Sequence, residues 1–259
     1  MTITLIGAGN VGYHLGKRLY KKGMTIHQVY SRQIGNAQLL AKKIKAKPTD
    51  DLSKIDGQAD LYLIAVKDDV IALVAEELGK NSVLKNKLFA HTSGAASSQL
   101  LARHFKRYGV FYPLQSFSKT REVKFSTIPI CMDARKKKDR QLLQLVGAKI
   151  SKKVARISDK ERAILHVAAV MVNNFSNHLF YLGQQITDAE QIDFDLLKPL
   201  MLETVLKIDQ HSPYDMQTGP ARRNDEKTIK KHLAYLQKFP EYVQLYTLLT
   251  KSIQHAYRR

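Results

Sequence analysis

The sequence is poor in the features that mark secreted, membrane-embedded or disulfide-stabilised proteins. Its 259 residues include one cysteine, Cys131, so no disulfide can form within the chain, and this scarcity is typical of a reducing compartment. The longest apolar run, residues 164–172, is about half a membrane span and is interrupted by His166. No signal peptide is recognisable, because a strand pattern begins at residue 2. We therefore expect a cytoplasmic protein without a membrane partner.

Several common catalytic motifs are missing as well. The sequence has no Walker phosphate-binding loop and no GxSxG nucleophile turn. Its nine histidines are scattered and have no carboxylates beside them at the spacing of metal ligands. We expect no metal cofactor.

Acidic residues are scarce relative to basic ones. Lys and Arg number 42 against 23 Asp and Glu, for a formal net charge of +19, and such a charge attracts anions, nucleic acids among them. The basic residues are spread along the whole chain, however, and the densest run, residues 135–140, is typical of the exposed start of a helix. No stacking-aromatic or groove-reading pattern accompanies it. Anionic metabolites or cofactors are the expected ligands, and nucleic-acid binding is a minor alternative.

The strongest motif lies at the start of the chain. Thr2–Ile6 has the β-branched, apolar composition of a buried strand, and a helical pattern begins near Val11. The glycines between them form a GxGxxG turn, which shapes the tight bend, lets the backbone approach a pyrophosphate and lets the helix pack closely on the strand. The helix N-terminus then faces the phosphates. The residues predicted to bind a dinucleotide here are Gly7, Gly9, Asn10, Val11 and Gly12.

The end of the second predicted strand, residues 25–31, indicates which dinucleotide binds. A carboxylate about 20 positions after the glycines binds the ribose hydroxyls of NAD. Here the strand ends in Ser31 and Arg32, and no acid follows until Asp50. Arg32 can make paired charge-assisted bonds to the 2′-phosphate of NADP, and Ser31 can donate another. NADP is favoured over NAD; an arginine exposed in a loop without a ligand is the alternative.

Strand and helix patterns alternate to about residue 155 and predict a doubly wound parallel sheet, a Rossmann domain over residues 1–155. Later strands are predicted at residues 60–66, 87–92, 107–112, 128–132 and 148–154, with a basic helix over 136–146. From residue 156 to 259 the pattern is helical throughout and predicts an all-helical domain for substrate binding and dimerisation. Its helices are predicted at residues 159–187, 195–210, 227–238 and 241–257.

Two strand ends are predicted to meet the cofactor and the substrate. Val66 follows a strand that is apolar on both faces, at the carboxyl edge where the cofactor's sugar and diphosphate lie. The next strand ends in Thr92 and Ser93, and Gly94 follows. This small, hydroxyl-rich loop offers hydrogen bonds to a nicotinamide and a substrate, with Ser93 as a candidate catalytic residue. A loop that merely caps the next helix is the alternative.

These stretches together resemble a known family. The stretches are Leu5–Gly12, His91–Gly94, Tyr112–Phe117, His166–Ala169 with Asn173 and Asn174, and Thr218–Asp225. The chain looks like the superfamily of 6-phosphogluconate dehydrogenase, pyrroline-5-carboxylate reductase and the deazaflavin-dependent NADP reductases. More closely, it is similar to bacterial Rossmann-like proteins whose C-terminal half is a domain of unknown function. The resemblance implies an NADP-dependent oxidoreductase, often a homodimer through the helical domain, that acts on a small carbonyl, hydroxy or imine compound.

The long predicted helix carries the sharpest catalytic candidates. His166 and Asn173 are seven residues apart, and therefore share a face of an α-helix. Asn174 is a candidate substrate contact, and buried amides at a helix contact are the alternative reading of Asn173 and Asn174. In the hydroxyacid-dehydrogenase branch of the superfamily, a Lys and an Asn act from this helix. This chain has no lysine between Lys160 and Lys198, so the role of that lysine is either lost or taken by His166. A core histidine is the alternative reading of His166, and a catalytically silent NADP-binding sensor or interaction protein is the alternative function.

The segment Thr218–Asp225 holds a second group of candidates. Arg222 and Arg223 can clamp a carboxylate or phosphate of the substrate, because the guanidinium fork matches those groups. Asn224 is predicted to cap the following helix. A structural arginine paired with Asp225 is the alternative.

Overall fold

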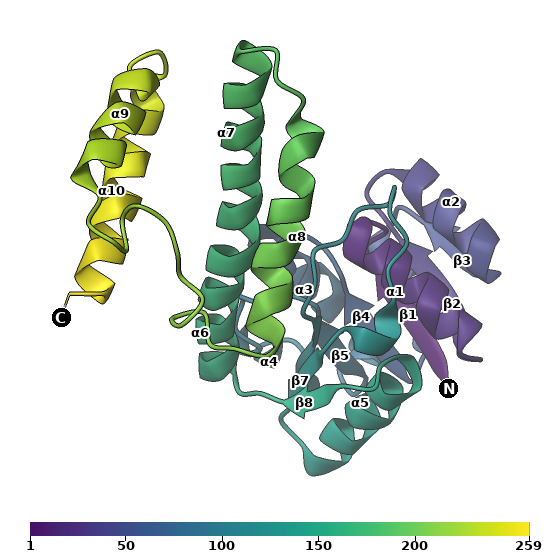
Figure 1. Cartoon of the computed structure of the whole chain (residues 1–259). Helices are drawn as coiled ribbons and strands as arrows, with labels where there is room; N and C mark the ends of the chain where they lie inside the picture. The colour runs from purple at the N-terminus through teal and green to yellow at the C-terminus, as the bar shows by residue number, and fades with distance from the viewer. Residues whose placement is uncertain (259) are drawn as a thin grey trace. The chain divides into compact units, whose positions relative to one another are not determined.

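The computed structural model describes residues 1–258. The chain divides into two compact units, Met1–Val170 and Met171–Arg259, and each unit is described by itself (Figure 1).

An eight-stranded sheet forms the centre of the first unit, in the order β3-β2-β1-β4-β5-β6-β7-β8. Its strands are β1 (Thr2–Ile6), β2 (Thr25–Tyr30), β3 (Lys47–Thr49), β4 (Leu61–Ile64), β5 (Leu88–His91), β6 (Arg107–Pro113), β7 (Ile130–Ala134) and β8 (Val154–Arg156). Neighbouring strands are parallel except for β6 and β7, which are antiparallel. The predicted Rossmann sheet is confirmed, with one antiparallel pair towards its far edge.

Alternate residues of the central strands enter two different cores. Leu61 and Leu63 of β4 belong to the core beneath α1 (Asn10–Lys21), whereas Tyr62 and Ile64 belong to the core on the opposite face. This alternation follows from the two-residue period of a strand, and burial on both faces explains the continuous apolar runs in the sequence. The helices α1, α2 (Ile34–Ile44) and α5 (Lys137–Ile150) contribute to the first core, and α3 (Ile71–Gly79) and α4 (Gln99–Ala102) to the second.

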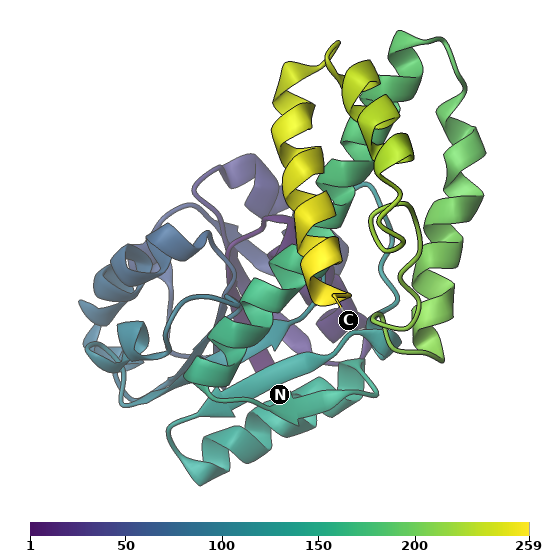
Figure 2. The ribbon, with the colours of Figure 1, turned by 60° about the vertical axis from the view of Figure 1, so that its left-hand side comes forward.

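The strand predicted at residues 148–154 is wrong at every position except its last, Val154. Helix α5 continues to Ile150, and β8 begins at Val154; both are drawn in teal in Figure 2. Leu143, Val146 and Ile150 are all buried, and their spacing of three and four residues places them on one helical face. A short apolar run cannot distinguish a buried strand from the end of an amphipathic helix by periodicity alone.

The second unit is helical, and no strand occurs in residues 171–258. Its main helices are α7 (Ser176–Ala189), α8 (Lys198–Leu206), α9 (Glu226–Leu236) and α10 (Pro240–Ala256). Both views show α7 beside α8 and α9 beside α10 (Figures 1 and 2). Pro199 lies in the first turn of α8, where its missing N–H costs no hydrogen bond. The all-helical prediction is confirmed.

The long helix predicted over residues 159–187 contains an irregular segment. Helix α6 (Asp159–Ala169) passes into a π-helical segment, Val170–Phe175, before α7 begins. In this segment the hydrogen bonds run from residue i to i+5 rather than i+4. A search of residues 1–258 finds no helix with the length and apolar content that crossing a membrane requires.

Candidate functional site

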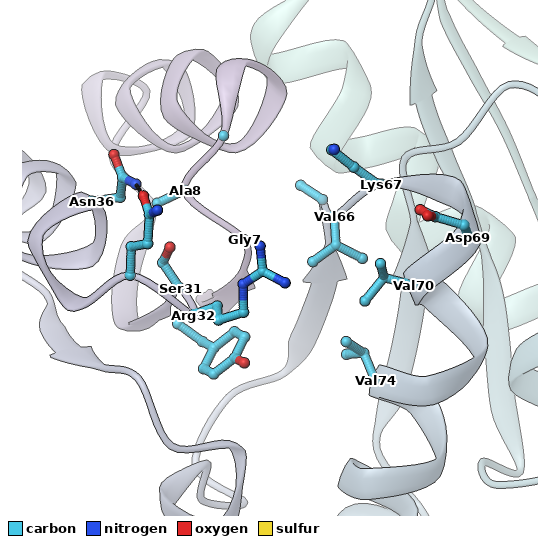
Figure 3. Close-up of a pocket in the computed structure, with 14 residues that line it drawn as sticks. Gly7, Ala8, Ser31, Arg32, Asn36, Val66, Lys67, Asp69, Val70 and Val74 are labelled. Carbon is cyan, nitrogen blue, oxygen red and sulfur yellow. Dashed lines mark hydrogen bonds between the residues drawn. The ribbon is translucent and has the colours of Figure 1, made fainter.

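A cavity of about 450 Å³ opens at the carboxyl ends of β1, β2 and β4. Figure 3 shows side chains from all three strand ends around it. Its lining includes Gly7, Gly9, Ser31, Arg32 and Val66. The fold therefore brings together five of the residues predicted to bind the cofactor, from segments up to 59 residues apart.

The three glycines of the turn have different physical roles. Gly7 has a φ of +119°, and a Cβ there would lie 2.3 Å from the carbonyl oxygen of Ala65. A Cβ at Gly12 would lie 2.0 Å from the carbonyl oxygen of Gly7. Both positions therefore require glycine for the fold itself. A Cβ at Gly9, by contrast, would meet no protein atom within 4 Å, so Gly9 leaves open space at the cavity wall.

The N-terminus of α1 is suited to an anion. Gly9 is the N-cap residue and provides no side-chain acceptor, and no acidic residue occupies the first turn. Asn10, Val11 and Gly12 begin the helix, and first-turn amides have no acceptor within it. Together with the helix dipole, these amides favour a diphosphate at the position that Gly9 leaves open. The residues present fit a dinucleotide.

Arg32 provides the positive charge at the end of β2. Its guanidinium extends into the cavity from beside Ser31 (Figure 3), and within residues 1–258 it forms no ion pair with a carboxylate. The lining contains one carboxylate, Asp69, which follows β4 rather than β2. A free guanidinium where an NAD-specific fold has a carboxylate suits the 2′-phosphate of NADP.

A second polar region lies at the end of β5, within the first unit. Thr92 and Ser93 are buried, and the Ser93 hydroxyl accepts hydrogen bonds from the backbone N–H groups of Ala95 (3.1 Å) and Ala96 (2.9 Å). The Thr92 hydroxyl donates to the carbonyl of Ile64 at 3.4 Å. The Ser93 oxygen thus shapes the loop, while its hydroxyl proton remains available to a ligand.

Gly94, Tyr112 and His166 converge beside this loop. A Cβ at Gly94 would lie 2.6 Å from Nδ1 of His166 and 2.9 Å from the hydroxyl oxygen of Tyr112. The two rings are 6.4 Å apart, in an edge-to-face arrangement. Nδ1 of His166 is buried without a hydrogen-bond partner among the described residues. Burial, the nearby Cys131 thiol and Asp68 raise the pKa of Tyr112 above its usual value.

Tyr112 is a site residue that the sequence reasoning missed as an individual candidate. Its signal was its place at the end of β6, as the first residue of the stretch Tyr112–Phe117. Strand ends at the carboxyl edge of a parallel sheet are where ligands bind, so the position itself could have drawn attention to the phenol.

An ion pair within α6 is hydrogen-bonded to the loop after β5. Arg162 is 1% exposed and donates to Asp159 Oδ1 at 2.8 Å and to the carbonyl of Ala96. Oδ2 of Asp159 accepts from the Ser97 hydroxyl at 2.7 Å and from the Ser98 N–H at 2.7 Å. Burial alone would raise the pKa of Asp159, but the bonds from Ser97 and Arg162 hold it below its usual value. The pair therefore fixes the start of α6, and with it His166, against the loop.

His91 lies beneath the loop after β5, and its imidazole ring is neutral. It is fully buried, and its Nδ1 accepts the backbone N–H of Ser93 at 3.2 Å. Burial, followed by the positive charge of Arg162, lowers the pKa of His91 to about 4. An imidazole with this pKa holds the loop as a hydrogen-bond acceptor at neutral pH.

Asn173 and Asn174 lie in the π-helical segment and are exposed. The amide nitrogen of Asn173 is 3.5 Å from the side-chain oxygen of Asn174. The predicted common face with His166 assumed unbroken α-helical spacing, and that assumption fails where the hydrogen bonds skip an extra residue.

Arg222 is held by its own loop. It donates to the carbonyls of Asp215 (3.3 Å) and Gln217, and its guanidinium lies 5.1 Å from the centroid of the Tyr257 ring. Arg223 is exposed. Among residues 1–258, neither arginine forms an ion pair with Asp225.

The predicted helix cap at Asn224 is wrong, because Asp225 caps α9. Asp225 accepts from the N–H of Thr228 at 3.0 Å and from its hydroxyl at 2.7 Å. Asn224 has a φ of +53°, in the left-handed region that asparagine tolerates. In the part of the chain described, no three His, Cys, Asp or Glu side chains are grouped so as to hold a metal ion.

Comparison with known proteins identifies the family. Residues 1–114 match the Rossmann-like domain family, and residues 128–253 match a domain of unknown function, DUF2520. A protein of Bacteroides fragilis, provisionally assigned as an NADP oxidoreductase, is 38% identical over 98% of both chains, with a TM-score of 0.92. The chain belongs to the Rossmann-like family with a DUF2520 domain. This confirms the family resemblance in the sequence.

More distant structural neighbours share the fold alone. An imine reductase of Myxococcus stipitatus in complex with NADP+ is 17% identical, with a TM-score of 0.70 over 99% of this chain and 94% of its own. A reductive aminase of Aspergillus terreus, in complex with NADPH and ethyl levulinate, is 14% identical, with a TM-score of 0.74 over 98% and 93%. Among proteins with curated functions, none matches this chain.

Proposed function

We propose that this protein is an NADP-dependent oxidoreductase that transfers a hydride between NADP(H) and a small carbonyl, hydroxy or imine compound. The observation that carries the proposal is the cavity at the glycine turn, where Arg32 forms no ion pair within residues 1–258 and no carboxylate stands at the end of β2. The relative from Bacteroides fragilis, provisionally assigned as an NADP oxidoreductase, supports it. So do the shared fold and the NADP-bound state of the imine reductase.

Different residues of the chain bind different parts of the cofactor. The amides at the start of α1 hold the diphosphate where Gly9 leaves space. Arg32 and Ser31 bind the 2′-phosphate, and Val66 packs against the cofactor at the end of β4. When bound, the cofactor supplies or accepts the hydride.

His166 and Tyr112 bind and transfer the proton that accompanies the hydride. The raised pKa of Tyr112 keeps its phenol protonated, so Tyr112 donates a hydrogen bond to the substrate oxygen or nitrogen. His166, whose ring faces Gly94, exchanges the proton with that atom. The Ser93 hydroxyl orients the substrate. Asn173, Asn174, Arg222 and Arg223 remain candidate substrate contacts.

We propose that a second copy of the chain covers the helical unit, so that residues 156–259 serve substrate binding and dimerisation. Neither α7 nor α8 contains a buried residue, although a helix in water gains most of its stability by burying an apolar face. The exposed apolar side chains of α8 are Leu200 (63%), Leu202 (60%), Val205 (59%) and Leu206 (56%). Leu202, Val205 and Leu206 share one helix face at spacings of three and four residues, and an exposed apolar face of this kind marks an association surface.

A silent NADP-binding sensor is the second candidate function. The absence of a lysine between Lys160 and Lys198 favours it, because the family branch with known chemistry uses a lysine there. NADPH consumption with a panel of cyclic imines and ketones separates the two candidates. An enzyme consumes NADPH with at least one of these compounds and loses turnover, but not NADPH affinity, in a His166→Ala variant.

Calorimetric titration with NADPH and NADH tests the cofactor site. Arg32→Ala should weaken NADPH binding by about 10- to 100-fold, because it removes a charge-assisted hydrogen bond to the 2′-phosphate. The affinity for NADH, which lacks this phosphate, should be nearly unchanged. Arg103→Ala removes an equally exposed charge that does not line this cavity and should change neither. Absence of binding of both nucleotides at millimolar concentration would overturn the proposal.

A further inference from the structure

A second cavity, of about 410 Å³, lies between one face of α1 and the segment 119–125. It has no lining residue in common with the cavity at the glycine turn. Its lining holds one carboxylate, Glu122, and five cationic side chains: Lys17, Arg18, Lys21, Lys119 and Arg121. We call this second hollow the basic cavity.

The charges of the basic cavity are not neutralised by the protein. Within residues 1–258, none of the five cations, nor Glu122, forms an ion pair. Arg18 donates from Nε and Nη2 to the carbonyl of Ile150 at 3.3 and 3.1 Å. Lys119 donates to the side-chain oxygen of Asn36 at 3.1 Å. These partners are uncharged and leave the positive charges uncompensated.

Two of the ammonium groups are held at the same aromatic ring. Nζ of Lys17 lies 5.2 Å and Nζ of Lys119 lies 5.7 Å from the centroid of the Tyr13 ring. The ring attracts each cation weakly but cannot cancel their mutual repulsion. Lys17, Arg18 and Lys119 are half-buried, so salt screens this repulsion less than it would at an open surface. A multiply charged anion in the cavity would remove it.

We propose that the basic cavity binds a small polyphosphate anion, with two or three linked phosphates bridging Lys17 and Lys119. The guanidinium of Arg121 adds a fork that matches a phosphate. The cations line one hollow from two segments, α1 and residues 119–125. The three aromatic rings of the lining, Tyr13, His14 and Phe125, are 9%, 8% and 4% exposed, so none offers the open face on which a nucleic-acid base stacks. These features favour a small anion over a nucleic acid.

Calorimetric titration of the full chain with tripolyphosphate tests the proposal. We expect the double variant Lys17→Gln/Lys119→Gln to weaken binding by about tenfold or more. The control Lys42→Gln/Lys43→Gln also removes two lysines, in this case from the last turn of α2, and should change the affinity by less than about twofold. Because the glycine turn also attracts phosphates, Arg32→Ala is the second control and should bind tripolyphosphate like the unmodified protein.

Three outcomes overturn the proposal. An equal loss of tripolyphosphate affinity in Lys17→Gln/Lys119→Gln and in Lys42→Gln/Lys43→Gln would show that the overall charge alone attracts the anion. A loss of tripolyphosphate affinity in Arg32→Ala, without a loss in Lys17→Gln/Lys119→Gln, would place the anion in the cavity at the glycine turn. A DNA duplex that displaces tripolyphosphate through the same two lysines, with a steep salt dependence, would identify the face as a nucleic-acid surface.

Discussion

The Nδ1 atom of His166 lies 2.6 Å from the point where a Cβ atom of residue 94 would stand. The backbone of Gly94 and the imidazole are therefore in direct contact, although 72 residues of sequence separate them. The absence of a side chain at Gly94 is what allows the loop after β5 to reach α6. The proposed proton-transferring residue thus lies against the proposed substrate loop.

The first prediction concerns this contact. Gly94→Ala should lower turnover with the best substrate of the imine and ketone panel by about tenfold or more, because a methyl group displaces His166 and Tyr112. The affinity for NADPH should change little. Gly35→Ala, at a position where a Cβ meets no atom within 4 Å, is the control and should retain full activity. Unchanged turnover in Gly94→Ala would mean that His166 does not act at this loop.

The second prediction separates the glycines of the N-terminal turn. Gly9→Ala should leave the melting temperature unchanged but weaken NADPH binding by about tenfold, because its methyl group meets the ligand rather than the protein. Gly12→Ala should destabilise the fold by about 2 kcal/mol or more, because its Cβ collides with the carbonyl of Gly7. Thermal unfolding and calorimetry measure the two effects. Normal NADPH affinity in Gly9→Ala would place the diphosphate elsewhere.

The third prediction follows from the depressed pKa of His91, about 4 in the folded protein. The unfolded imidazole titrates near pH 6.5, so between about pH 6.5 and pH 4 the unfolded state binds the extra proton. Stability is therefore lost as pH falls through this window, by about 2 kcal/mol between pH 6.5 and 5. Urea unfolding at pH 7 and pH 5 measures the loss. His91→Asn, which keeps an acceptor for Ser93 but does not titrate, should reduce the difference between the two pH values; an undiminished difference would assign the effect to other groups.

The fourth prediction tests dimerisation through α8. Leu202→Glu/Leu206→Glu places two charges one turn apart on the same face and should convert a dimer into a monomer, as measured by light scattering after size exclusion. Leu145→Glu is the control, since Leu145 is 65% exposed on α5 of the first unit, and it should remain a dimer. A monomeric unmodified protein at tens of micromolar would contradict the proposal.

Local physics made much of the architecture predictable. Runs such as Leu61–Ile64 are buried on both faces, and their continuous apolar composition reflects this burial. The spacing of the glycines in the N-terminal turn is typical of a turn between a strand and a helix. The same logic failed at residues 148–153, because Ala148 and Ile150 suit either a strand or the end of α5. It failed again at residues 170–175, because a π-helical segment has no simple periodic signature.

The sequence by itself determined the Rossmann fold, the helical second half and the choice of an NADP cofactor, because each rests on patterns within short stretches of the chain. The tertiary structure decided which distant side chains meet. Three contacts join segments that are 66 or more residues apart in the sequence. Arg162 bonds to Ala96, His166 lies against Gly94, and Lys17 and Lys119 lie at one tyrosine ring. Such contacts depend on how the sheet orders its strands and how the loops cross its edge, and no local pattern encodes that order.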